Sequence, residues 1–193
     1  MNFLVKKGAV FGYLGPNGAG KSTTIRSLMG FIKPNSGASK ILDLNKKTEN
    51  IEEIISYDSW TDSDKIQKII GYVPGEIAFP ENMTGIELLK MVFKLRNMSD
   101  WNDVKKQIYY WKFDPSLKIK KMSKGMKQKL ALCIAWMHNP DIIILDEPTT
   151  GLDPLMQEKF VNLVKKSKKE GKTIILSSHI FSEIEKHVIM FQL

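Results

Sequence analysis

Apolar residues along this chain fall into short strand-like runs separated by stretches with helical spacing. Asp141–Asp146 is an almost unbroken apolar run between two acids, which is typical of a central parallel strand covered on both faces. Ala9–Leu14, Ile69–Val73 and Thr173–Ser177 predict further strands. Helices are predicted over Lys21–Gly30, Thr84–Arg96, Trp101–Trp111, Lys124–His138, Met156–Lys169 and Phe181–Lys186. This alternation predicts an α/β fold with a mostly parallel sheet flanked by helices.

The middle of the chain interrupts that alternation. Residues 76–121 contain two predicted helices with no strand between them, so we expect a small helical subdomain inserted in one domain that spans residues 1–193. A chain of 193 residues has the length of one well-packed domain. Asn45–Asp64 is polar and is interpreted as a linker, and Ile189–Phe191 predicts the start of another strand.

Composition narrows the class of protein. Hydrophobic residues make up 42% and charged residues 26% of the chain, which favours a globular protein over a disordered or fibrous one. No run of about 18 apolar residues and no export signal is visible, so the sequence predicts no membrane-spanning segment. The net charge of +8 comes from scattered Lys and Arg, which favours solvated basic faces, near an anionic membrane surface, over a nucleic-acid interface. The single cysteine, Cys133, is expected in the core.

A glycine-rich segment links the first predicted strand to the first predicted helix. Gly15–Ser22 fits the pattern GxxxxGK[ST], in which glycines let backbone N–H groups converge on a phosphate at a helix N-terminus. Lys21 is then expected to reach the β- and γ-phosphates, and the Ser22 hydroxyl to join the shell of a Mg²⁺ ion. The alternative is a glycine-rich turn that only starts a helix. The predicted ATP contacts in this segment are Asn17, Gly18, Gly20, Lys21, Ser22 and Thr23.

A pair of acids follows the central apolar run. Asp146 at the end of that run is expected to face Mg²⁺, usually through water, so Ser22 and Asp146 are the predicted metal residues. Glu147 could polarise an attacking water as a general base. Taken alone, an acidic pair after a strand is more often a helix-capping loop. Together with the glycine-rich segment, it favours nucleotide hydrolysis.

Further motifs indicate which kind of nucleotide hydrolase this is. Met122–Gln128 (MSKGMKQ) precedes Asp146, Thr150–Asp153 (TGLD) follows it, and Ser177–His179 (SSH) comes next. This ordered set resembles the ATPase subunits of ABC transporters over essentially the whole chain. The sequence of the Met122–Gln128 motif is most similar to that of the ABC-2 type exporters. The resemblance implies a P-loop NTPase fold that carries a helical insert subdomain.

The resemblance also implies a dimer. In that family two copies pack head to tail, and each nucleotide lies between the phosphate loop of one copy and the signature helix of the other. In this chain the signature corresponds to Met122–Gln128, at the start of the helix predicted from Lys124. Ser123 and Gly125 would then contact the γ-phosphate of the partner's nucleotide, while Asp153 would couple the two sites. His179 would hold the γ-phosphate and the attacking water. On sequence grounds alone, Ser123 is a helix N-cap, which is compatible with that role, and a lone histidine beside a helix start is more often structural.

The function expected from this resemblance is that of an ATP-binding subunit that hydrolyses ATP, with Mg²⁺, to drive export. The membrane path would belong to separate transmembrane permease subunits, and this chain would sit in the cytoplasm on the inner face of the cell membrane. In the dimer, the second ATPase subunit would be another copy of this chain or a paralogous subunit. No nucleic acid partner is expected. Phe79–Met83 would contact the permease, unless it is an ordinary surface loop.

Three departures from the family pattern support an alternative. Gly75 stands where the family usually has a glutamine that touches Mg²⁺. Only fourteen residues precede Gly15, where relatives have antiparallel strands and an aromatic residue for adenine; Phe3 would lie in the last of these strands and is not assigned that role. The chain also stops at Leu193, soon after the last motif. The alternative is therefore a truncated, hydrolysis-deficient nucleotide-binding remnant. An ABC protein that acts on ribosomes or DNA is disfavoured, because paired ATPase domains and coiled-coil arms are not seen.

Overall fold

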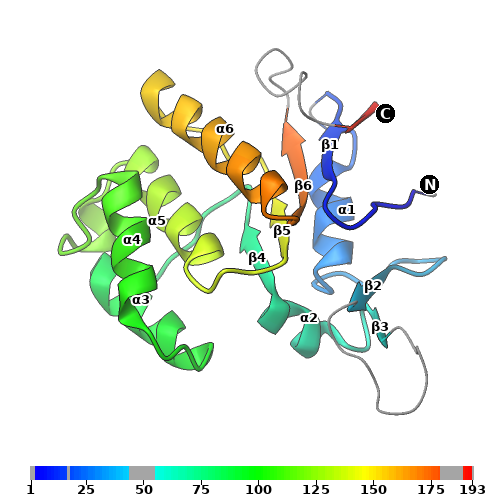
Figure 1. Ribbon diagram of the computed structural model, residues 1–193, viewed down its shortest axis with the longest axis horizontal. Helices are drawn as coiled ribbons and strands as arrows, with labels where there is room; N and C mark the ends of the chain where they lie inside the picture. Colours follow the sequence, from blue (N-terminus) through cyan, green and yellow to red (C-terminus); the bar gives the residue numbers. More distant parts are fainter. Residues whose placement is uncertain (1–2, 17, 44–54, 179–188, 193) are drawn as a thin grey trace.

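A five-stranded parallel sheet forms the centre of the protein. The computed structural model describes residues 3–16, 18–43, 55–178 and 189–192. The strands of this sheet are β1 (Val10–Leu14), β4 (Ile70–Val73), β5 (Ile142–Leu145), β6 (Thr173–Ser178) and β7 (Ile189–Gln192). Their spatial order is β4-β5-β6-β1-β7, and every neighbouring pair is parallel. The predicted α/β fold with a mostly parallel sheet is confirmed, as is the strand that begins at Ile189 (Figure 1).

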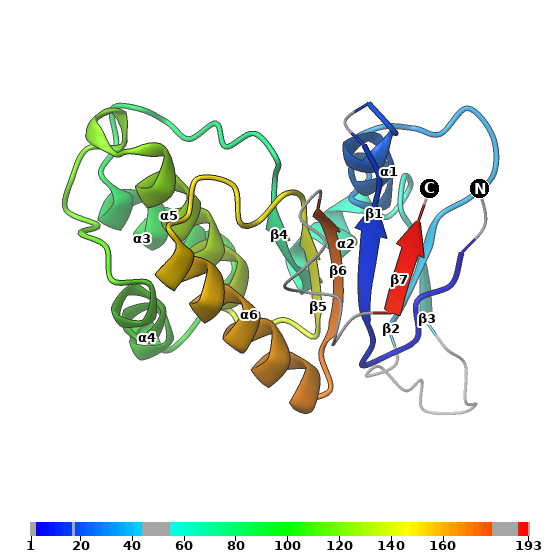
Figure 2. The ribbon, with the colours of Figure 1, turned by 90° about the horizontal axis from the view of Figure 1, so that it is seen from above.

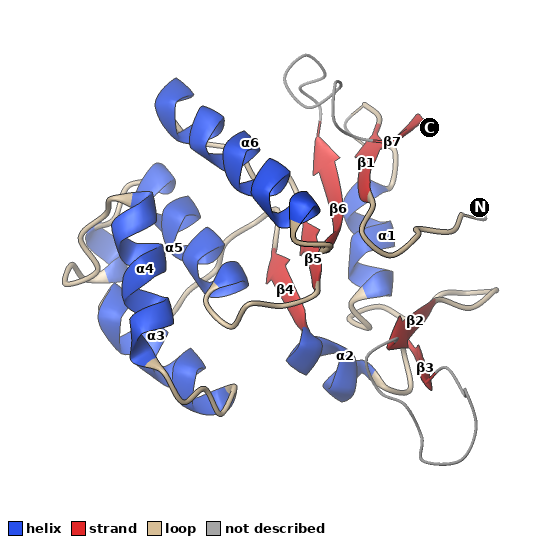
Figure 3. Ribbon diagram, in the orientation of Figure 1, coloured by secondary structure: helices blue, strands red, loops and turns tan. Residues whose placement is uncertain are grey.

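Helices cover both faces of this sheet, which is why its strands are apolar on both sides. In β5, Ile143 and Leu145 belong to one buried cluster, whereas Ile144 belongs to the other. The helices α5 (Lys124–Trp136) and α6 (Pro154–Lys169) pack on the first face, and α1 (Lys21–Leu28) and α2 (Ser63–Ile69) pack on the second (Figure 3). The carboxyl ends of the strands therefore meet along one edge, between two helical layers.

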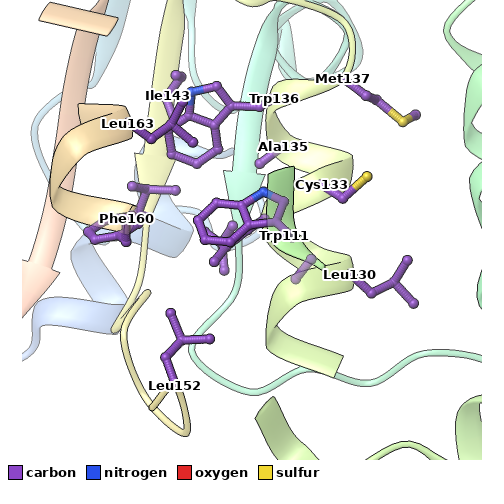
Figure 4. Packing of buried hydrophobic residues seen from close by; sticks show 14 of the residues in the cluster. Trp111, Leu130, Cys133, Ala135, Trp136, Met137, Ile143, Leu152, Phe160 and Leu163 are labelled. Atoms are coloured by element: carbon purple, nitrogen blue, oxygen red, sulfur yellow. The ribbon is translucent and has the colours of Figure 1, made fainter. Parts of the chain in front are cut away.

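The larger of the two cores lies under α5 and α6. Trp136 and Phe160 meet edge to face, with ring centroids 6.4 Å apart and an interplanar angle of 89° (Figure 4). The indole Nε1 of Trp136 donates to Ser167 Oγ at 3.1 Å, so this buried ring keeps a polar partner. Cys133 is fully buried in the same core, as predicted, and its burial raises the pKa of the thiol.

Three further helical elements pack beside this core. They are α3 (Gly85–Leu95), α4 (Trp101–Trp111) and the short 3₁₀ helix η1 (Ile119–Lys121). Thr84 begins α3 with a capping box in which its side chain accepts from the backbone N–H of Glu87. The Tyr110 hydroxyl donates to the carbonyl of Lys159 at 2.7 Å, which ties α4 to α6. These helices lie to one side of the sheet in Figures 1 and 3, and the division of residues 76–121 as a subdomain stays a prediction.

The structure corrects the interpretation of Asn45–Asp64 as a linker. Within its described part, β3 (Ile55–Asp58) pairs antiparallel with β2 (Lys40–Asp43), and α2 begins at Ser63 (Figure 2). The pattern is polar because this two-stranded sheet buries little: the paired residues Ile41 and Tyr57 are its buried side chains among the residues described. One apolar position per strand is too weak a signal for a sequence-based prediction.

Other boundaries differ less. Helix α6 begins at Pro154, two residues before the predicted start at Met156, because Asp153 caps it and proline is favoured in the first helical turn. Phe3 does not lie in a strand, although the sequence placed it in one. The helix predicted over Phe181–Lys186 lies outside the described residues. In the part of the chain that the structure describes, no helix has both the length and the apolar character needed to cross a bilayer.

Candidate nucleotide site

The phosphate loop joins β1 to α1 in the conformation that its glycines allow. Gly18 and Gly20 have φ of 84° and 83°, a left-handed region that side chains disfavour. Gly20 is the N-cap of α1, no side-chain cap bond is made there, and the first turn of α1 contains no acid. The N–H groups of that turn therefore face outward with the positive end of the helix dipole, which is the donor set that a phosphate needs.

Lys21 lies inside this loop. Its side chain is 6% exposed, and Nζ donates to the carbonyl of Gly15 at 2.7 Å and to that of Pro16 at 3.1 Å. The same Nζ lies 3.9 Å from Glu147 Oε1. The ammonium is thus positioned by loop carbonyls and faces the acidic pair. Ser22 is half-buried and Thr23 is exposed on the first turn of α1, and Asn17 lies outside the described residues.

The acidic pair sits where β5 ends. Asp146 is 2% exposed, and its backbone N–H donates to Val73 on the neighbouring strand β4 at 2.9 Å. Ser177 on the other neighbour, β6, donates from Oγ to Asp146 Oδ1 at 2.6 Å. The backbone N–H of Glu147 in turn donates to Ser177 Oγ at 2.9 Å. Lys21, Asp146 and Glu147 are therefore brought together at one edge of the sheet, and their roles in hydrolysis stay a prediction.

Gly75 packs directly against Asp146. A Cβ placed on Gly75 would lie 2.8 Å from Asp146 Oδ2, closer than real Cβ atoms approach. A side chain at this position would therefore displace the carboxylate or the backbone, so the glycine is matched to its neighbour. Nearby, burial and the Asp146 charge raise the pKa of Tyr72 to about 12.

The predicted signature residues form a second group, on α5 and the loop that precedes α6. Ser123 Oγ accepts from the backbone N–H of Met126 at 3.2 Å, which confirms the helix N-cap interpretation. A Cβ on Gly125 would lie 2.7 Å from the carbonyl oxygen of Gly151, so the helix and the loop touch through their backbones. Asp153 Oδ1 accepts from the backbone N–H of Met156 at 2.9 Å. The side chains of Ser123 and Asp153 thus cap their own helices, and both residues are exposed.

One hydrogen bond that the sequence did not predict connects the two groups. Gln128 is 3% exposed, and its Nε2 donates to the carbonyl of Pro148 at 2.8 Å. Pro148 directly follows Glu147, so the signature helix holds the segment that leaves the acidic pair.

The sequence also did not predict Ser177 as a site residue, although it lies in the SSH motif. Its alignment with Asp146 follows from the register that pairs Leu145 with Leu176, which the sequence alone does not reveal. His179 lies outside the described residues.

The residues present fit a magnesium ion that is shared with a nucleotide. Among the residues described, no group of three or more His, Cys, Asp or Glu side chains could hold a metal by itself. Magnesium is usually held by one or two protein oxygens together with substrate phosphates. Asp146 provides a buried carboxylate next to Glu147, and Ser22 provides a hydroxyl on the residue after Lys21, which are donor types that match that pattern.

A cleft of about 1080 Å³ opens beside α1. It is bounded by the segment Phe3–Lys7, by the face of α1 that carries Thr23 and Thr24, and by residues 34–42. The ring of Phe3 stacks on Phe11, with centroids 5.2 Å apart and an interplanar angle of 10°. Phe3 therefore both packs against the core and lines the cleft, and no role in base binding is assigned to it.

Comparisons with known proteins identify the family. A family model described as "ABC transporter" matches residues 1–150. This chain belongs to the ABC transporter family. It is 39% identical over 191 residues to the bacitracin transport ATP-binding protein BcrA of Bacillus licheniformis, covering 97% of this chain and 58% of that protein. It is 33% identical to the probable multidrug ABC transporter ATP-binding protein YbhF of Escherichia coli, covering 96% of this chain and 31% of that one. The chain therefore spans less than two thirds of these relatives.

The fold of this ABC family member also matches solved structures. A post-hydrolysis dimer of the ATP-binding cassette MJ0796, bound to ADP and Pi, superposes with a TM-score of 0.82 at 24% sequence identity. The match covers 100% of this chain and 84% of that one. At this identity the likeness establishes the fold, and it confirms the P-loop NTPase class predicted from the sequence.

Proposed function

We propose that this chain binds ATP with Mg²⁺ and hydrolyses it as the ATP-binding subunit of an ABC exporter. The observation that carries this proposal is the convergence of Lys21, Asp146 and Glu147 at one edge of the sheet, with 3.9 Å between Lys21 Nζ and Glu147 Oε1. Family membership supports the proposal, because the motifs occur in the order and in the fold that the family requires.

Each residue has a proposed part in the reaction. The first turn of α1 and the Lys21 ammonium bind and orient the phosphates. Asp146 and Ser22 would hold the magnesium ion, and a bound ion would supply positive charge beside the transferred phosphoryl group. Glu147 accepts a proton from the attacking water as general base, or orients that water. His179 is proposed to support the γ-phosphate, and Asn17, Gly18, Gly20 and Thr23 to complete the nucleotide contacts.

We further propose that the working unit is a head-to-tail dimer. Gly125 contacts Gly151, two residues before Asp153, and Ser123 and Asp153 are both exposed. In a second copy, these groups would close over the nucleotide, with the N-terminal dipole of α5 toward the γ-phosphate. The solved MJ0796 cassette with ADP and Pi is itself dimeric, which supports the proposal for this chain.

The transport step is also a proposal. BcrA and YbhF are described as transport or probable multidrug ATP-binding proteins, which supports an exporter whose membrane path lies in separate permease subunits. This chain would then act at the inner face of the cell membrane. Phe79–Met83, next to the helices between residues 76 and 121, is the proposed permease contact, and Phe79 and Met83 pack partly buried against the larger core.

The test is ATP hydrolysis by the purified 193-residue chain with Mg²⁺, measured beside Lys21→Ala and Glu147→Gln. A rate above background that both substitutions lower by at least about 100-fold would support the proposal, since each removes a group that acts on the transferred phosphoryl. Nucleotide binding without any hydrolysis by the unsubstituted chain would contradict it and favour the remnant. A binding assay with the same three proteins separates these outcomes.

A further inference from the structure

One fully buried hydroxyl lies between the two acids of the candidate site. Ser177 is 0% exposed, near the carboxyl end of β6. Its Oγ is 2.6 Å from Asp146 Oδ1 and 2.9 Å from the backbone nitrogen of Glu147. We propose that Ser177 is a positioning residue that orients the Asp146 carboxylate and the Glu147 backbone for hydrolysis. This inference rests on the proposed function.

The two hydrogen bonds fix the direction in which the hydroxyl points. The Glu147 N–H can only donate, so Ser177 Oγ accepts from it. The single hydroxyl proton of Ser177 is then directed to Asp146 Oδ1, which accepts. A separation of 2.6 Å lies in the range of a charge-assisted bond from a hydroxyl to a carboxylate. One hydroxyl therefore holds both the side chain of Asp146 and the backbone of Glu147.

The backbone of Glu147 needs such an anchor. Its φ is 49°, in the left-handed region that non-glycine residues rarely adopt. Residues held in this region cluster at functional sites, where the surrounding structure enforces the conformation. The hydrogen bond to Ser177 is a contact of the Glu147 N–H itself, so it acts at the residue whose backbone is strained. Loss of the hydroxyl would free Glu147 to relax away from Lys21.

The other side of Asp146 is closed as well. The backbone of Gly75 lies against Oδ2, where an added Cβ would come within 2.8 Å. The carboxylate is thus held between a hydroxyl from β6 and a glycine that follows β4, while its own strand β5 lies between them. On the same face of β6, Ile175 precedes Ser177 and is part of the buried core under α1. A hydroxyl at the next position on a buried face requires polar partners, and the two acids of the site provide them.

The test removes the hydroxyl in two ways. Ser177→Ala deletes it, and Ser177→Cys keeps the size of the side chain but offers only a weak donor. Each should lower kcat for ATP about 10- to 100-fold, with a smaller change in KM, because misplaced catalytic groups cost rate more than binding. Ser177→Thr restores a hydroxyl and should return most of the lost rate. Melting temperatures identify any variant that fails to fold.

Ser167→Ala is the matched control. Ser167 is also buried, at 2% exposed, and its Oγ accepts one hydrogen bond from Trp136. Ser167 lies in the last turn of α6, about 20 Å along the helix axis from Pro154 at the start of that helix. The Ser167→Ala variant therefore removes a buried hydroxyl that does not contact the acids of the site. The control should retain the kcat of the unsubstituted chain. A Ser177→Ala protein with unchanged kcat overturns the inference. So does a folded Ser177→Thr protein that does not recover the kcat lost in Ser177→Ala.

A second readout keeps this inference separate from the proposed hydrolysis. If the unsubstituted chain shows no hydrolysis, the proposed function has failed, and the positioning role is then judged from ATP affinity with Mg²⁺ and with EDTA. Ser177→Ala should lower the ratio of these two affinities at least about 3-fold, because Asp146 no longer holds one orientation, and leave the affinity in EDTA unchanged. An unchanged ratio would overturn the inference in that case.

Discussion

The two groups of predicted site residues differ in how much of their environment the chain itself provides. The acidic edge is largely buried, with Lys21 6% exposed, Asp146 2% exposed and the Glu147 side chain 20% exposed. Ser177 bonds to Asp146 Oδ1 and to the backbone N–H of Glu147. The signature group is exposed, and Ser123 and Asp153 make cap bonds to their own helices. One half of the proposed site is therefore preorganised within a single chain, while the other half presents its groups outward.

This difference is what a site shared between two copies requires. Buried polar groups must find partners inside the fold, and a catalytic group works best when those partners hold it before the ligand arrives. A group that serves the neighbouring copy has to remain accessible until that copy docks. The backbone contact between Gly125 and Gly151 fixes the position of the signature group without burying it. Variants that damage one half of the site at a time test whether two copies share it.

The largest expected effect comes from mixing two damaged copies. Lys21→Ala disables the phosphate loop of one copy, and Ser123→Arg blocks the signature helix of the other by placing a bulky cation at its exposed N-cap. Each variant alone should lose at least about 100-fold in rate. In a mixture, half of the statistical dimers pair the two variants, and these regain one intact site. ATPase measured against mixing ratio should therefore rise to a maximum near equal amounts.

A matched control gives this mixing test its meaning. Lys21→Ala mixed with Glu147→Gln cannot rebuild a site, because both changes damage the same half, and its rate should stay at the level of the single variants. A mixture with Ser123→Arg that stays equally inactive would show that the two halves do not combine across copies. Activity in either single variant close to that of the unsubstituted chain would instead show that its half is not required.

The second effect should come from the contact that fixes the signature group. Replacing glycine by alanine inside a helix usually stabilises it by up to about 1 kcal/mol. Gly125→Ala should do the opposite and destabilise the fold by about 1–3 kcal/mol, because its Cβ would meet the Gly151 oxygen at 2.7 Å. Urea unfolding measures the change, with Lys127→Ala on the same helix as the control. A Gly125→Ala protein as stable as the original would show that the close approach is not maintained.

The sequence predicted the acidic edge far better than the contacts that support it. Lys21, Asp146 and Glu147 were found because phosphate chemistry demands these residue types at fixed distances from a strand and a helix, and such spacing is visible in one dimension. Ser177 was missed, because its role depends on the register between two strands that are far apart in the sequence. The contact between Gly125 and Gly151 likewise depends on how a helix and a loop approach each other in space.

The third prediction concerns the bond that joins the two halves. Gln128→Leu removes the donor to Pro148 and leaves a buried carbonyl without that partner, which should cost about 1–3 kcal/mol of unfolding free energy. Gln157→Leu is a matched control, since Gln157 Nε2 also donates to a backbone carbonyl, that of Leu152, from a less buried position. Urea unfolding should show a smaller loss for Gln157→Leu, and equal losses would show that burial does not raise the contribution of the Gln128 bond to stability.

The smallest effect should be a pH-dependent change in the free energy of unfolding. It comes from His138, which lies just beyond the C-terminal end of α5. Burial, followed by the charge of Arg96, lowers the pKa of His138 to about 3 from an ordinary value of 6.5. Between these two values the unfolded chain binds a proton that the folded chain does not, so stability rises with pH and is lost as pH falls below about 6.5. From pH 7 to pH 6 this histidine alone should cost about 0.7 kcal/mol.

Comparison with His138→Gln isolates that contribution, because other groups titrate equally in both proteins. The difference in unfolding free energy between the two proteins should shift in favour of the variant as pH is lowered, with the steepest change below about pH 6. ATPase KM at neutral pH should be the same in both, since His138 follows the carboxyl end of α5 whereas Ser123 begins it. A parallel pH dependence of the two stabilities would mean that the fold does not lower the pKa of His138. A changed KM would mean that the two ends of α5 are coupled. The exposed signature group would then depend on the buried packing at the far end of its own helix.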